Sequence, residues 1–141
     1  MILVSIGGTV LLPLTTVLDV DPRPLYHVAL ASDWEGAQAA GRYAVSTRGR
    51  SLEDEGFVHC SFPEQVEATA NRFYDDVDDV VLLRIDLDRL SCPVVVEDLV
   101  GSGEAFPHVY GAIDLDAVIE ARPWPLPRDG SRSFAHVSPR T

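Results

Sequence analysis

Three histidines of this chain stand in short apolar or aromatic runs whose pattern is typical of β-strands. They are His27 in Leu25–Val28, His59 in Phe57–Ser61 and His108 in Phe106–Gly111. Because successive side chains of a strand point to opposite faces, each histidine should share a face with the residues two positions away. His59 is expected beside Phe57 and Ser61, and His108 beside Phe106 and Tyr110, while Val58, Cys60 and Val109 face a core. Such a face would suit a ligand pocket lined by strands. A single buried histidine is more often a satisfied core residue than a ligand contact, but three in matching contexts favour the pocket.

Two familiar catalytic arrangements fit this spacing poorly. Three imidazoles could hold a zinc ion with water in the fourth position, but no two of them lie on one helical turn or in a tight motif. A three-histidine metal-dependent enzyme is therefore an alternative only, and no metal is expected. A serine hydrolase is disfavoured because no nucleophile elbow is present, and Gly101-Ser102-Gly103 is typical of a flexible turn. The chain has no lysine, which excludes Schiff-base and phosphate-loop lysine chemistry.

A nucleotide pocket fits the residue types better. Aromatic rings stack on bases, while histidine and tyrosine bind sugar hydroxyls and amides. Arg48, in the polar stretch 47–55, could hold a pyrophosphate. The carboxylate that faces a ribose would be Glu97, at a strand end, or Glu104, shortly before His108, although either could be a surface or capping group. No G-x-G-x-x-G motif follows a strand, so a Rossmann mode of binding is not indicated.

The composition is that of one acidic globular domain. The chain has 141 residues, 22 acidic and 11 basic, which gives a formal net charge of −11. Such a surface repels phosphate backbones and anionic membranes, so neither nucleic acid nor a membrane is expected as a partner. The two cysteines, Cys60 and Cys92, form no zinc motif or disulfide framework, and Cys60 is expected to be a small buried hydrophobe rather than a nucleophile. A cytoplasmic location is the default expectation.

The order of elements predicts an α+β domain. We expect a helix from a Ser32–Glu35 capping box to Ala40 with Gly41 as its stop, and a second helix that opens at Ser61–Glu64. Strands are expected over 25–29, 43–46, 56–59, 80–86, 94–97, 106–111 and 116–122. The prediction is a single domain with a split or curved mixed sheet and two helices in its N-terminal half. Its parts are an N-terminal extension over 1–23, the domain over 24–127 and a flexible C-terminal tail over 128–141.

Several of these segments carry a family resemblance. The runs Leu25–His27, Glu55–Ser61 and Gly103–Gly111, in this order, resemble the small bacterial family DUF952, of unknown function. This family is similar in fold to ADP-ribosyltransferases, whose split sheet holds NAD with the nicotinamide in a cleft. The resemblance places His59 and Ser61 in one family motif, Glu104, His108 and Tyr110 in another, and His27 on the first strand. In transferases of the His-Tyr-Glu type, these residue types bind the ribose, stack on nicotinamide and stabilise the developing cation, but the His-Gly-Thr motif is absent here.

Together these observations predict an NAD-binding or related nucleotide-binding cleft, with ADP-ribosyl or glycosyl transfer as its reaction. The expected cofactor-binding residues are His27, Tyr43, His59, Ser61, Tyr110 and Arg48, and the expected catalytic residues are Glu104, Glu97 and His108. The sequence leaves open whether the protein is an enzyme. A non-catalytic small-molecule binding or sensor module would keep the cleft without an inward carboxylate. An RNA 2′-phosphate transferase is disfavoured by the net charge of −11.

Overall fold

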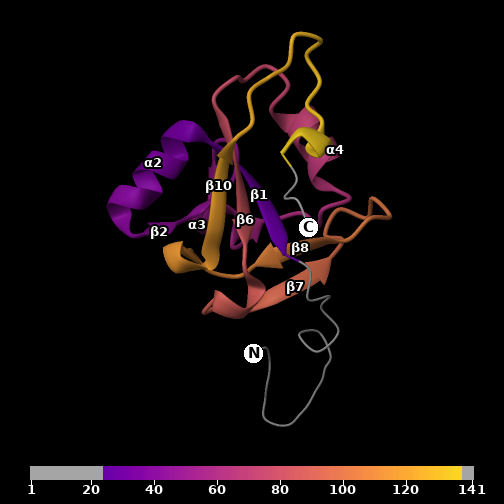
Figure 1. Ribbon diagram of the computed structural model, residues 1–141. Helices are drawn as coiled ribbons and strands as arrows, with labels where there is room; N and C mark the ends of the chain where they lie inside the picture. Colours follow the sequence, from indigo (N-terminus) through magenta and orange to yellow (C-terminus); the bar gives the residue numbers. More distant parts are fainter. Residues whose placement is uncertain (1–23, 138–141) are drawn as a thin grey trace.

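Two three-stranded antiparallel sheets frame the molecule in the computed structural model (Figure 1). The structure describes residues 24–137, so the predicted extension over 1–23 and residues 138–141 lie outside it. The first sheet has the order β1 (Leu25–Leu30), β6 (Val80–Ile85), β10 (Val118–Pro123). The second has the order β5 (Val58–His59), β8 (Phe106–Val109), β7 (Val94–Glu97). The sheets meet at one isolated bridge, where Tyr26 and Ser61 exchange two backbone hydrogen bonds of 2.8 Å.

Short strands complete the β-structure. β2 (Arg42–Tyr43) pairs with β9 (Ile113–Asp114), and β3 (Val45–Thr47) pairs with β4 (Arg50–Ser51). Every pairing between these described strands is antiparallel. The expected mixed sheet is therefore wrong: the strands form several small antiparallel sheets.

Three α-helices occur among residues 24–137, instead of the two that were predicted. They are α2 (Ala31–Ala40), α3 (Leu52–Glu55) and α4 (Val66–Phe73). Three short 3₁₀ turns follow later in the chain: η1 (Leu87–Arg89), η2 (Leu115–Ala117) and η3 (Phe134–His136). In Figure 1, α2 and α4 lie on different sides of the β1–β6–β10 sheet. The domain thus combines α and β elements, as predicted, but with more and shorter elements.

The starts of the helices differ from the sequence prediction, whereas the predicted end of α2 is correct. α2 begins one residue before Ser32, so the predicted capping box does not form, and no side chain caps the helix. The predicted stop is confirmed, because Gly41 has φ +90° and donates its amide to the Ala37 carbonyl. A capping box forms instead at Ser51 and Asp54, inside the polar stretch 47–55, where no helix was predicted. α4 begins at Val66, later than predicted, because Ser61 belongs to the bridge that joins the two sheets.

Strand β1 supplies side chains to two apolar cores. Leu25 and Ala29 belong to a core that also contains Val58, Cys60 and Val109. The alternate residues of β1, Tyr26 and Val28, pack with α4, β6 and Trp124 in a second core. This alternation follows from the period of two along a strand, and it places His27 on the face of the first core.

The C-terminal segment packs on the domain. Trp124 is buried in the second core, and the Arg132 guanidinium donates to the backbone carbonyls of Trp124, Tyr74 and Val77. The domain therefore extends through residue 137, and the prediction of a flexible tail from residue 128 is wrong for 128–137. The prediction failed because the segment holds few apolar residues, and its main anchor is an arginine that binds carbonyls.

Candidate functional site

One face of the β5–β8–β7 sheet carries the predicted histidine cluster. His59 lies directly across from His108 in the antiparallel ladder, and Glu97 lies across from Phe106. Val58 and Val109, which alternate with the two histidines, are fully buried in the first core. The predicted division of faces is confirmed for both strands, and a carboxylate from the third strand joins the histidines.

Four polar side chains of this face form a hydrogen-bonded chain. The Tyr110 hydroxyl donates to Glu97 Oε2, and the same oxygen lies 2.8 Å from His108 Nδ1. His108 Nε2 then lies 3.3 Å from His59 Nδ1. Because an ionised carboxylate only accepts hydrogen bonds, His108 must donate through Nδ1, which orients its ring toward Glu97. We call Tyr110, Glu97, His108 and His59 the relay.

Aromatic rings flank the relay. Phe57 stacks on His108, with ring centroids 4.1 Å apart and planes at 19°, and it also contacts Tyr110. Phe106 lies against His59 with a centroid distance of 5.0 Å. Since Tyr110 is 37% exposed whereas His108 is 5% exposed, solvent reaches the relay from its tyrosine end.

Burial fixes the protonation of two relay members. Burial lowers the pKa of His59 to about 4, and the neighbouring His108 and His27 add to this effect. Partial burial, assisted by the hydrogen bond to Glu97 and its negative charge, raises the pKa of Tyr110 to about 12. At neutral pH His59 is therefore an uncharged imidazole, and Tyr110 keeps its proton as a donor.

His27 has a separate set of partners. Its Nδ1 lies 2.6 Å from the His59 carbonyl, and its Nε2 lies 2.8 Å from the Tyr43 hydroxyl. Burial lowers the pKa of His27 to about 4, so the ring is neutral, donates through Nδ1 and accepts from Tyr43. The hydrogen bond between His27 Nδ1 and the His59 carbonyl joins β1 to β5, next to the isolated bridge between Tyr26 and Ser61. The structure thus brings the predicted residues His27 and Tyr43 together, but each satisfies the other, and a ligand contact from them stays a prediction.

A small cavity lies beside His27 and His59. Its volume is about 10 Å³, which is close to the least that one water molecule requires. The cavity is lined by His27, Val28, Ser46, Thr47, His59, Ser61, Thr69, Phe73 and Tyr74. The predicted residue Ser61 is buried there, with its hydroxyl 3.2 Å from that of Thr69. This space is far smaller than a nucleotide, so a nucleotide would have to bind on the open face of the relay.

Two predicted site residues lie away from the relay. Glu104 is exposed and accepts a hydrogen bond of 3.1 Å from Gln65 Nε2. Arg48 is exposed, forms an ion pair of 2.6 Å with Asp76 and donates to the Phe73 carbonyl. Of the two candidate carboxylates, only Glu97 makes a hydrogen bond with the histidines.

Sequence reasoning named Phe57 and Phe106 as neighbours of the histidines but did not include them among the site residues. It missed Ser46 and Thr69, which line the cavity, and Gln65, whose amide joins the start of α4 to the loop before β8. The alternation of the strands was a usable signal for the two phenylalanines. No local pattern marked the other three, because their partners come from distant segments.

The described residues offer little support for metal or thiol chemistry. Within residues 24–137 no group of three histidine, cysteine, aspartate or glutamate side chains is placed to hold a metal ion. Cys60 is fully buried, and burial raises the pKa of its thiol, so it packs as a protonated, small apolar side chain.

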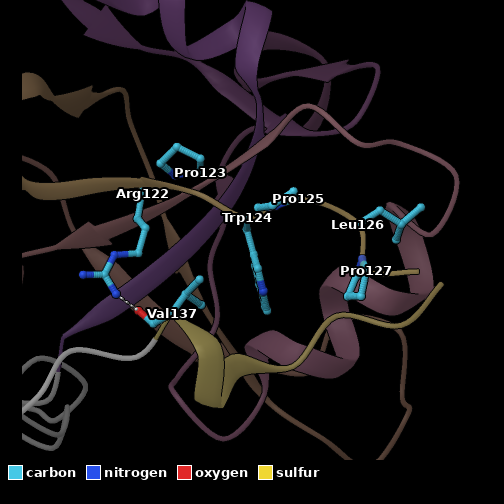
Figure 2. Close-up of a pocket in the computed structure, with 7 residues that line it drawn as sticks. All are labelled: Arg122, Pro123, Trp124, Pro125, Leu126, Pro127 and Val137. Carbon is cyan, nitrogen blue, oxygen red and sulfur yellow. Dashed lines mark hydrogen bonds between the residues drawn. The ribbon is translucent and has the colours of Figure 1, made fainter. Parts of the chain in front are cut away.

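A larger hollow lies at the C-terminal segment, as Figure 2 shows. Its volume is about 450 Å³, and it is lined by Arg122, Pro123, Trp124, Pro125, Leu126, Pro127 and Val137. The guanidinium on its wall already donates to the Val137 carbonyl at 2.9 Å and pairs with Glu120 at 3.1 Å. The hollow is thus mainly an apolar and proline-lined surface, with no described acid–base group beyond this paired arginine.

Comparisons with known proteins define the class to which this fold and site belong. The chain matches the family described as "Protein of unknown function (DUF952)" over residues 28–121, more than half of its length. It belongs to this family, as the histidine motifs predicted. The matched region contains the whole relay. It also contains both three-stranded sheets, apart from residues 25–27 of β1 and 122–123 of β10.

Solved structures of one bacterial protein share the fold. The chain is 27% identical to protein CC0527 from Caulobacter crescentus, whose X-ray structure it matches with a TM-score of 0.69. This match covers 80% of the present chain and 96% of the other. The solution NMR structure of CC0527 matches with a TM-score of 0.62 at 24% identity, and covers 80% and 94% of the two chains. No curated protein matches the chain. None of the described helices is long and apolar enough to cross a membrane.

Proposed function

We propose that the relay face of the β5–β8–β7 sheet binds a small nucleotide, NAD or a related molecule. The observation that carries this proposal is the position of Glu97, which is held beside His108 and Tyr110 on a face that also presents aromatic rings. A carboxylate turned toward the histidines is the feature that separates a transferase site from a purely structural histidine pair. The further likeness to an ADP-ribosyltransferase fold belongs to the same proposal.

Each group on this face has a role that fits such a ligand. The rings of Phe57 and Tyr110 offer flat surfaces for a base or a nicotinamide. The neutral His59 can exchange hydrogen bonds with a sugar hydroxyl. Glu97 can stabilise positive charge that develops at an anomeric carbon, and His108 positions that carboxylate. ADP-ribosyl or glycosyl transfer is the reaction class that this arrangement supports best.

A non-catalytic binding module is the second candidate. It is favoured by the fact that one Glu97 oxygen already accepts from both His108 and Tyr110, as a purely structural carboxylate would. The three-histidine metal enzyme loses support, because both ring nitrogens of His27 contact protein groups. The proposed partner is a small molecule rather than nucleic acid or a membrane, in accord with the net charge of −11. A cytoplasmic location is part of the same proposal.

Calorimetric titration with NAD tests the binding site. We expect the wild type to bind and Phe57→Leu to bind about 10-fold or more weakly, since loss of one stacking ring costs about 1–3 kcal/mol. Val96→Ala is the matched control, because Val96 is exposed on β7 and alternates with Glu97 onto the opposite face. Circular dichroism verifies that both variants fold. An absence of heat from the wild type would overturn the nucleotide proposal, and equal weakening by both variants would place the ligand elsewhere.

An assay of nicotinamide release from NAD distinguishes the transferase from the non-catalytic binding module. If the relay is catalytic, Glu97→Gln should keep NAD binding but lose turnover by about 100-fold or more, because its neutral amide no longer stabilises the developing charge. Glu104→Gln is the control, since Glu104 is an exposed carboxylate that does not contact the relay. Binding without turnover in the wild type would instead support the binding module.

A further inference from the structure

Glu97 holds a carboxylate beside aromatic rings on the relay face. Its side chain is 20% exposed, so part of it is open to a ligand. Both of its donors, His108 and Tyr110, bond the same oxygen, Oε2, and no described residue bonds Oε1. Phe57 stacks on His108 and also contacts the ring of Tyr110. A carboxylate beside aromatic rings attracts an organic cation, because the anion and the faces of the rings both favour positive charge.

No permanent positive charge balances this carboxylate among the described residues. The ion pair of Glu97 is with the imidazole of His108, which, unlike a guanidinium, need not carry charge at neutral pH. Arg48, which the sequence placed at the site, pairs with Asp76 at 2.6 Å instead. Because the Glu97 carboxylate is largely removed from water, a cation beside it is more favourable than it would be beside an exposed carboxylate. Glu97 can therefore serve as the counter-ion of a ligand.

The two segments that supply the relay strands are acidic along their length. Residues 51–71 contain β5 and five acidic residues, and residues 90–121 contain β7, β8 and six acidic residues. Neither segment contains an arginine, and the chain has no lysine. Glu55 and Glu120 pair with arginines that flank the segments, and the other acids leave a surplus of negative charge. Such a region attracts cations and repels phosphate groups, and neither segment offers a charged donor for a pyrophosphate.

We propose that the relay face is a site for an N-substituted pyridinium cation, with Glu97 as its counter-ion and the rings of Phe57 and Tyr110 as its contact surface. This inference rests on the proposed function, because the nicotinamide ring of oxidised NAD is such a cation. It narrows the substrate class to a pyridinium nucleoside, whose cation and sugar contact the relay while no phosphate is required. The neutral, reduced form of the same ring binds more weakly, since it offers no positive charge to the carboxylate.

Calorimetric titration with 1-methylnicotinamide and with its neutral 1,4-dihydro form tests the selection of charge. Neither compound has a glycosidic bond, so a transferase would not consume it. We expect the cation to bind the wild type about 10-fold or more tightly than the neutral form. In Glu97→Gln this preference should disappear. Glu104→Gln is the matched control and should keep the preference, since it removes an exposed carboxylate of the same region that does not contact the relay.

Titration with nicotinamide riboside and with NAD tests the substrate class. The riboside carries the cation and the sugar but no phosphate, so we expect it to bind at least as tightly as NAD. If NAD binds about 10-fold or more tightly than the riboside, the nucleoside class is wrong, because the second half of the dinucleotide then contributes about 1.4 kcal/mol of the affinity. Circular dichroism verifies that the variants fold, and if Glu97→Gln does not, the comparison of ligands on the wild type decides the result.

Three results of the first titration would overturn the inference. They are equal binding of the cation and the neutral form by the wild type, an unchanged preference in Glu97→Gln, and an equal loss of preference in Glu104→Gln. If NAD still bound the wild type, the proposed function would stand without the pyridinium site. Binding of 1-methylnicotinamide and of the riboside, but not of NAD, would have the opposite meaning: the pyridinium site would stand and the NAD proposal would fail. No binding of any of these compounds would overturn both.

Discussion

At the scale of single residues, the three histidines divide into two roles. His27 is fully satisfied by the His59 carbonyl and the Tyr43 hydroxyl, and it joins β1 to β5. His59 and His108 belong to the relay. Strand spacing could predict which face each histidine occupies. It could not predict their partners, because Tyr43 and Glu97 lie 16 and 11 residues away from the imidazoles that they contact.

The two buried neutral histidines make a prediction about acid stability. His27 and His59 have a pKa of about 4 in the folded protein, against an ordinary value of 6.5. Between these values the unfolded chain binds more protons than the folded one, so the free energy of unfolding should fall as pH drops from about 6.5 to about 4. Each histidine contributes a slope of about 1.4 kcal/mol per pH unit, and the contribution is fully present above pH 6.5.

Urea unfolding at several pH values across this window measures the slope. His59→Gln should reduce it by about half, because glutamine does not titrate and His27 still does. A free energy of unfolding that stays flat across the window would show that the two imidazoles accept protons as readily in the folded state as in the unfolded one.

At the scale of elements, the strands with continuous runs of apolar residues were the most predictable parts. β6 and β7 follow the predicted ranges closely, because short runs rich in valine, leucine and isoleucine strongly favour a β-strand. The four-residue helix α3 was missed, since an element this short has no hydrophobic period and its capping box uses aspartate. The position of α4 depends on the bridge at Ser61, which is a contact between distant segments.

The C-terminal segment leads to a prediction about Arg132. Arg132 as a whole residue is 1% exposed, and its guanidinium donates to the carbonyls of Trp124 at 2.6 Å and Tyr74 at 2.7 Å. Arg132→Ala should lower the free energy of unfolding by about 3 kcal/mol or more, because several buried carbonyls lose their donor. Arg132→Lys should lose less, since the ammonium keeps the charge and part of the donor set.

Urea denaturation with Arg128→Ala as the control checks this expectation. Arg128 is exposed in the same segment, so its truncation should change stability by about 0.5 kcal/mol at most. Equal effects of the two alanine variants would mean that the contacts of Arg132 with the buried carbonyls contribute no more to stability than an exposed arginine does.

At the scale of the whole molecule, composition and motifs predicted the fold class and the family. The sequence segments around the histidines led to DUF952, and the family match over residues 28–121 confirms that assignment. The sequence could not predict how wide the space between the sheets would be. The cavity beside His27 and His59 has a volume of only about 10 Å³, and its lining residues come mainly from β1, β3, β5 and α4, which are far apart in the sequence. This cavity is too small to enclose a nucleotide, so the proposed binding site is the exposed face of the relay.

The most direct test of the central claim is a map of amide chemical-shift changes when ¹⁵N-labelled protein is titrated with NAD. We predict saturable changes that concentrate on the relay face, at Phe57, His59, Glu97, His108 and Tyr110. The hollow around Trp124 serves as the internal comparison, because it is the larger space and lies on the C-terminal segment. An unchanged spectrum, or changes concentrated around Trp124, would contradict the account.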